Sequence, residues 1–182
     1  QRLIGDLLSS LELSERSLRD LKDVRSGNRA REAERSGWKG FPGKPPFPLS
    51  FLEDLYNEVY NARLTLMTLE VRQGDTEKRL KERLAKLEKS GKELRLAEER
   101  LATAARGATG TRNLWLRDLA RLRHDANEAG ALAEETYRRV VLENIQGLRE
   151  HRIFQERNYA IAEAESPLSQ KDLDRKLEEL ES

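Results

Sequence analysis

Apolar residues recur at alternating steps of three and four along one stretch of the chain, from residue 52 to residue 69. This spacing puts an apolar side chain at every a and d position of a heptad, which is the pattern of a helix that packs along another helix. The sequence therefore predicts a coiled-coil seam, formed by Leu52, Leu55, Val59, Ala62, Leu66 and Leu69.

The same periodicity, with its interruptions, predicts the other elements. We expect an amphipathic helix over residues 1–25, followed by a linker rich in glycine and proline at residues 26–48. A long antiparallel helical hairpin is expected over residues 49–165, with its turn at residues 107–111, where two glycines lie close together. A short helix over residues 166–182 would complete an all-α fold, an elongated hairpin or coiled-coil-like bundle of about three to five helices.

Further details of these helices follow from single residues. The apolar face of the first helix is expected to consist of Leu3, Leu7, Leu11, Leu18 and Leu21. The run Gly74-Asp75-Thr76 is expected to break or kink the first arm of the hairpin, and Asp75 or Thr76 can cap the helix that follows. The seam pattern fits a hairpin that closes within one chain and equally one that closes between two chains.

The linker combines positive charge with aromatic side chains. Arg29, Arg31, Arg35, Trp38 and Phe41 are its candidate interaction residues. They allow two interpretations, of which the first is a strap whose aromatic rings hold an extended, proline-rich segment against the helices. The second is a site for single-stranded nucleic acid, bound by ring stacking and phosphate contacts. We favour the strap because the tract is short and contains no known RNA-binding signature.

Composition supports long, thin helical packing. Leu, Lys, Arg, Glu and Ala make up 105 of the 182 residues, and aromatic residues only 5%. Such a mixture is typical of coiled coils and cannot build a thick globular core. The formal net charge is +1, with both signs interleaved along the helices, so no uniform field favours nucleic acid or an anionic membrane.

Residues that could carry chemistry are scarce. The chain has no cysteine, which excludes disulfides, thiolate nucleophiles and zinc fingers. His124 and Glu128 have the i, i+4 spacing of a metal-binding pair, but no second pair of this kind supplies the remaining ligands. No nucleophile elbow, P-loop or dinucleotide fingerprint occurs. We therefore predict a protein that is not an enzyme and needs no metal or cofactor.

Two stretches of the chain carry a resemblance to a known family. The run PPFPLSFLEDL at residues 45–55, followed by ARLTLMTLE at residues 62–70, is similar to the long helical region ahead of the membrane part in larger bacterial channels. The segments at residues 137–152 and 161–169 resemble the same kind of region. The family is that of the small-conductance mechanosensitive channels. The resemblance implies a soluble, extra-cytoplasmic domain without the pore-forming helix, and no catalytic residue.

These observations define the expected function. The chain begins at Gln1 and its single methionine is Met67, which predicts a mature form without its signal segment or a piece of a longer protein. The leading hypothesis is a periplasmic, non-enzymatic interaction domain of a channel-like membrane protein, which associates with itself or with another protein. The first alternative is a cytoplasmic coiled-coil adaptor or scaffold that binds a partner protein. The second is nucleic-acid binding through the linker.

Overall fold

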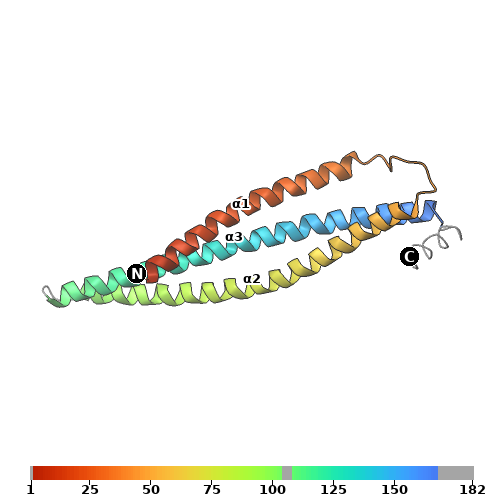
Figure 1. Cartoon of the computed structure of the whole chain (residues 1–182). Coiled ribbons are helices and arrows are strands. Elements are labelled where there is room, and N and C mark those ends of the chain that lie inside the picture. The colour runs from red at the N-terminus through yellow and green to blue at the C-terminus, as the bar shows by residue number, and fades with distance from the viewer. Residues whose placement is uncertain (1, 104–107, 168–182) are drawn as a thin grey trace. The chain divides into compact units, whose positions relative to one another are not determined.

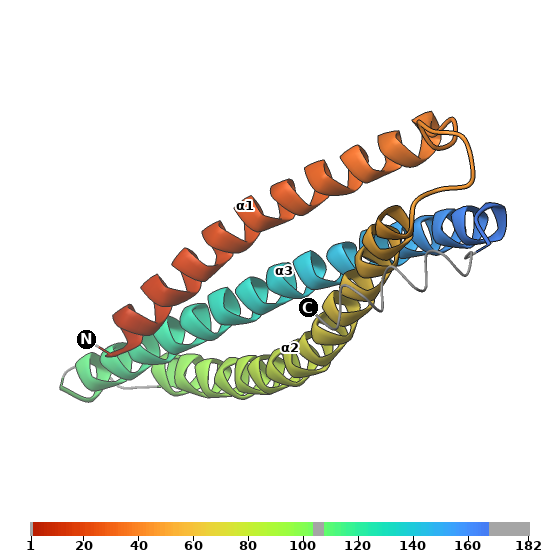
Figure 2. The same cartoon turned by 45° about the vertical axis from the view of Figure 1, so that its right-hand side comes forward.

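The fold is all-α, as the sequence predicts. A computed structural model describes residues 2–103 and 108–167, and these residues form three long helices. They are α1 (Arg2–Gly37), α2 (Leu49–Thr103) and α3 (Ala108–Glu165), shown from red to blue in Figure 1. No strand occurs within these residues. The described part of the connection between α1 and α2, residues 38–48, contains no helix or strand, and Figure 2 shows its course.

The chain divides into two compact units, and each helix contributes one stretch to each of them. The first unit consists of Gln1–Arg25 and Val71–Glu143, and the second consists of Ser26–Glu70 and Asn144–Ser182. In both units the stretches of α2 and α3 face each other within the one chain.

In the first unit, α2 and α3 run antiparallel. Arg79 pairs with Glu134 at 3.4 Å, and Arg121 pairs with Glu98 at 3.6 Å. The Arg25 side chain of α1 donates hydrogen bonds from Nε and Nη2 to the Glu143 carboxylate of α3, at 2.8 and 2.6 Å. This guanidinium lowers the pKa of the Glu143 carboxyl. The fork geometry matches both carboxylate oxygens, which fixes the orientation of the pair.

The core of the first unit is built mostly from small side chains. Its buried residues include Ser10, Ser17, Thr76, Ser90, Ala120, Ala126, Ala131, Ala133 and Glu134. A Cβ added at Gly130 would lie 3.3 Å from Arg83 Nη1 and 3.5 Å from Ser10 Oγ, so backbone and neighbouring side chains are close there. Small residues permit such close approach of helices. The many dispersion contacts between closely packed atoms then stabilise this core, as large apolar side chains do in other cores.

The second unit contains the seam, and its core is larger and more apolar. Leu52, Val59, Ala62, Leu66 and Leu69 of α2 are buried, and Leu55 is half-buried. Ile145, Phe154 and Ala162 of α3 are buried in the same unit. Two ion pairs at the margins, Arg63 with Glu156 at 2.8 Å and Arg149 with Glu70 at 2.7 Å, set the antiparallel register.

Within the second unit, α1 and α3 approach each other closely at Gly147. This glycine is buried, and a Cβ at its position would overlap the Asn28 side chain of α1. The Asn28 amide oxygen accepts a 2.8 Å hydrogen bond from Arg31 Nη1 on the same helix. Only a residue without a side chain leaves room for this arrangement.

Three expected boundaries differ from the structure. α1 ends at Gly37 and not at residue 25, so the non-helical linker begins at residue 38. Gly27 does not end the helix because good helix formers follow it and the first proline is Pro42. α2 continues through Gly74-Asp75-Thr76 without a break. The Thr76 hydroxyl donates to the Arg72 carbonyl oxygen at 2.7 Å, so this residue lies inside the helix and does not cap it.

The remaining boundary concerns the turn of the hairpin. α3 begins at Ala108, so residues 108–111 of the expected turn are helical. The rest of that turn, and nearly all of the short helix expected at residues 166–182, lie outside the described residues.

Candidate interaction surfaces

The connection between α1 and α2 is held by aromatic packing in the second unit. Trp38, Phe41, Phe47, Phe51 and Phe154 form a chain of ring contacts with centroid distances between 5.1 and 5.9 Å. Most of these pairs are edge-to-face, the arrangement that aromatic quadrupoles favour. The Phe47 backbone N–H also donates to Ser166 Oγ at 2.6 Å. The connection is therefore bound to both α2 and α3.

The five strap residues have different environments. Trp38 and Phe41 belong to the aromatic cluster, and the Arg157 guanidinium lies 4.9 Å from the Trp38 ring centroid. Arg35 pairs with Glu150 at 2.8 Å, whereas Arg31 bonds Asn28 as described above. Arg29 is exposed. Contacts within the unit therefore hold Arg31, Arg35, Trp38 and Phe41.

The two histidines lie on α3, in different units. His124 Nδ1 is 3.5 Å from Ser90 Oγ, and its ring lies against Gly91. His151 is partly buried, and its Nδ1 has no hydrogen-bond partner within the described residues. Desolvation lowers the pKa of His151; Glu34 and Glu58 raise it by smaller amounts, and Arg31 and Arg35 lower it further. Among residues 2–103 and 108–167, no group of three or more possible ligands could hold a metal ion.

We expect the chain to become less stable as the pH is lowered, because His151 takes up a proton more readily in the unfolded chain. Because the pKa of the folded imidazole is lowered, the unfolded chain binds the proton first, and the free energy of unfolding decreases as pH falls below about 6.5. Urea unfolding at about pH 7.5 and about pH 5.5 measures this decrease, which should be smaller in His151→Gln. Carboxyl groups such as Glu143, with an ordinary pKa of 4.5 that is lowered further, stay ionised over this range. An equal decrease in both proteins would contradict the assignment to His151.

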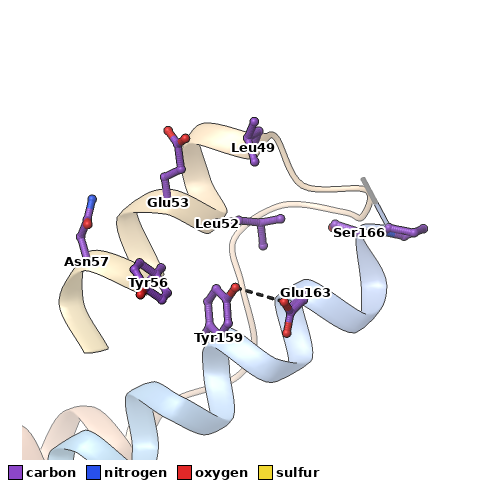
Figure 3. Close-up of a pocket in the computed structure, with 9 residues that line it drawn as sticks. Leu49, Leu52, Glu53, Tyr56, Asn57, Tyr159, Glu163 and Ser166 are labelled. Atoms are coloured by element: carbon purple, nitrogen blue, oxygen red, sulfur yellow. Dashed lines mark hydrogen bonds between the residues drawn. The ribbon is translucent and has the colours of Figure 1, made fainter. Parts of the chain in front are cut away.

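A pocket of about 530 Å³ lies in the second unit between the start of α2 and the end of α3. Figure 3 shows its lining residues, including Glu53, Tyr56, Tyr159 and Glu163. The Tyr159 hydroxyl donates to Glu163 Oε1 at 3.1 Å, and the Tyr56 and Tyr159 ring centroids are 5.9 Å apart. Burial, followed by this hydrogen bond, raises the pKa of Tyr159. The nine lining residues offer carboxylates and ring faces, and they include no serine–histidine or other nucleophile–base pair.

The outer face of α1 in the first unit carries a second apolar stripe. Ile4, Leu8, Leu11 and Leu18 are between 53% and 57% exposed. Their steps of four, three and seven keep heptad register, with Glu15 at the one position in between. The inner face consists of Leu3, Leu7, Ser10, Leu13, Ser14, Ser17, Leu21 and Val24, all buried or half-buried. Leu11 and Leu18, expected to lie on the inner face, therefore lie on the outer one.

A further exposed apolar group lies in the first unit, near the end of α2 and the start of α3. Trp115 is 74% exposed, the largest value among the large apolar residues of the described chain. Leu96, Leu114, Leu116 and Leu119 are exposed as well. The sequence pattern missed both this group and the outer stripe of α1. The spacing of Ile4, Leu8, Leu11 and Leu18 was the only available signal for the stripe.

Comparisons with known proteins indicate no function, so a function must be inferred from these surfaces. No protein-family model matches the chain, and neither a curated protein nor a solved structure matches it. No helix within residues 2–103 and 108–167 is both long and apolar enough to cross a membrane.

Proposed function

We propose that this chain is a non-enzymatic helical interaction module that associates with a second copy of itself through the outer stripe of α1. The observation that carries the proposal is the heptad spacing of four exposed apolar residues on one helix face, Ile4, Leu8, Leu11 and Leu18. A face of this kind is stabilised when another helix covers it, because its side chains then leave water.

Charge along α1 favours an antiparallel second copy as the occupant. Residues 2–15 contain three acidic residues and one arginine, whereas residues 16–25 contain four basic and two acidic residues. An antiparallel pair therefore brings the acidic half of each helix to the basic half of the other. A parallel pair brings like charge to like charge, which is unfavourable.

Sedimentation equilibrium of the full chain tests this proposal. We expect a dimer whose dissociation constant rises at least about tenfold in Leu8→Asn/Leu11→Asn, because two apolar side chains are lost from the interface. The matched control is Leu84→Asn/Leu132→Asn, which changes two leucines with similar exposure on α2 and α3. A monomeric parent chain, or a dimer that is unaffected by the stripe variant, would disprove the proposal.

The antiparallel orientation has its own test. Glu12→Arg/Glu15→Arg makes both halves of α1 basic, and Arg16→Glu/Arg19→Glu makes both halves acidic. Each variant should dimerise more weakly alone, while an equimolar mixture should form a one-to-one heterodimer. The separate variants distinguish the orientations: in a parallel pair the facing charges are already alike in the unsubstituted chain, so neither variant should dimerise more weakly than that chain.

The location of the module rests on the resemblance to mechanosensitive channels. In that reading the chain is the periplasmic part of a channel-like membrane protein, and dimer contacts would link subunits. In the alternative reading it is a cytoplasmic adaptor that binds a partner protein through the same stripe. The open reading frame on both sides of residues 1–182 distinguishes the two. A signal segment before the chain and several apolar stretches of about 20 residues after it support the first reading, and soluble sequence on both sides supports the second.

Nucleic-acid binding through the linker is less well supported. Two of the rings it would use for stacking, Trp38 and Phe41, pack in the aromatic cluster, and Arg35 is paired with Glu150. Binding through this segment would require these contacts to open.

A further inference from the structure

The exposed apolar group at the end of α2 and the start of α3 is accompanied by a groove. The groove has a volume of about 270 Å³. Its apolar walls are Leu96 and Ala97 from α2, together with Leu116 and Ala120 from α3, and two guanidinium groups, Arg100 and Arg123, line it as well. Glu93 and Asn113 complete the lining. The Asn113 side chain donates to the Arg100 carbonyl oxygen at 3.2 Å, which ties the start of α3 to α2.

Positive charge is concentrated around this groove. Residues 93–123 contain seven arginines and four acidic residues, although the chain as a whole has a net charge of only +1. Arg117 pairs with Asp118 and Arg121 pairs with Glu98. Arg95, Arg100, Arg112 and Arg123 have no carboxylate partner within the described residues. Within residues 2–103 and 108–167, this region therefore has more arginines than carboxylate partners for them.

The exposed side chains are of the kind that enter a lipid interface. Trp115 is 74% exposed, and the exposed Leu114, Leu116 and Leu119 surround it along the helix. Tryptophan favours the boundary between headgroups and acyl chains because one part of the ring is apolar and its N–H remains hydrated. Leucine next to it gains free energy by entering the same layer. Arginine is attracted to anionic headgroups and binds phosphate oxygens with its fork of donors.

From these observations we infer that this end of the first unit binds the surface of an anionic lipid bilayer. Trp115 and its neighbouring leucines enter the interface, while Arg100 and Arg123 bind lipid phosphates at the groove. The apolar group favours a bilayer over a nucleic acid, since leucines beside the arginines add nothing to phosphate-backbone binding. This surface is separate from the outer stripe of α1 and goes beyond the dimer proposed above.

Fluorescence of Trp115 in the full chain tests the inference directly. The only other tryptophan, Trp38, packs on Phe154 and is replaced by phenylalanine to isolate the signal. Vesicles of phosphatidylcholine with about one third phosphatidylglycerol should shift the emission to the blue and carry the protein upward in flotation. Vesicles of phosphatidylcholine alone should do neither, and added salt should weaken the binding.

Variants identify the residues responsible. Trp115→Ser and Arg100→Gln/Arg123→Gln should each weaken binding to the anionic vesicles by about tenfold. The controls are Leu132→Ser, an apolar site 17 residues further along α3 that is 61% exposed, and Arg72→Gln/Lys78→Gln, which removes two exposed charges elsewhere in the unit. Both controls should bind as the unsubstituted chain does. Circular dichroism establishes that every variant remains helical.

Three results would overturn the inference. The first is no binding to anionic vesicles, and the second is unchanged binding of Trp115→Ser. The third is a blue shift that appears without vesicles as the protein concentration rises, since a second copy of the chain would then cover the surface.

Discussion

Replacement of Leu66 by aspartate is expected to abolish cooperative unfolding of the unit that contains the seam. Leu66 is 4% exposed on the face of α2 that packs against α3. The substitution removes a buried leucine and introduces a carboxylate without a buried partner, and together these effects cost at least about 4 kcal/mol. That loss is comparable to the whole stability of many domains. Thermal melting followed by circular dichroism measures it.

The neighbouring residue provides a matched control. Met67 is on the same helix, one position further on, and is 63% exposed. Met67→Asp introduces the same carboxylate into solvent and should change the free energy of unfolding by less than about 0.5 kcal/mol. Similar melting curves for the two variants would contradict the packing of α2 on α3 that the seam defines.

Replacement of Gly147 by alanine is expected to have the second-largest effect, and its direction is opposite to that of the same change at Gly74. At Gly147 the new methyl group would overlap the Asn28 side chain, so α1 must shift or Asn28 must leave its position. We expect a loss of about 1–3 kcal/mol. At Gly74 a Cβ would meet nothing within 4 Å, and the residue lies within α2. Alanine should therefore stabilise that helix by about 0.5–1 kcal/mol.

Urea unfolding of both variants beside the unsubstituted chain gives the two free energies. Because glycine-to-alanine also restricts the unfolded chain, the Gly74 variant corrects for that effect at a site without contacts. If both variants were stabilised, the close approach of α1 to α3 at Gly147 would be incorrect.

The fold class could be predicted because it is determined by the regular spacing of apolar residues along the chain. The alternation of three- and four-residue steps from Leu52 to Leu69 specifies one buried face of one helix, and burial follows that face in the structure. Single residues were less informative. Gly74 and Thr76 are typical of helix ends, but here neighbouring turns continue the helix through them, because packing outweighs a local preference of about 1 kcal/mol. Gly27 did not end α1 either, because good helix formers follow it.

The candidate surfaces could not be predicted to the same extent. α1 carries two overlapping apolar stripes, and Leu11 and Leu18 fit a heptad in either one. Only the packing of small residues such as Ser10 and Ser17 against the unit decides which face is buried. Periodicity favours large apolar residues, so it assigned Leu11 and Leu18 to the buried face and did not indicate that Ser10 and Ser17 are buried. Trp115 lies close to Leu114, Leu116 and Leu119, and their spacing does not indicate which face of the helix is buried. Whether Trp115 is exposed therefore depends on where α2 packs against α3.

The contrast between the two cores also has a consequence for how the protein responds to temperature. The first unit buries mainly serine, threonine and alanine, beside Leu21, Val140 and Val141, whereas the second buries mainly leucine, isoleucine, valine and phenylalanine. The heat-capacity change of unfolding grows with the apolar area exposed and decreases with the polar area exposed. Cooling therefore weakens the driving force of the leucine-rich core more than that of the serine-rich core. The same three helices thus contain two regions whose stability curves differ in curvature.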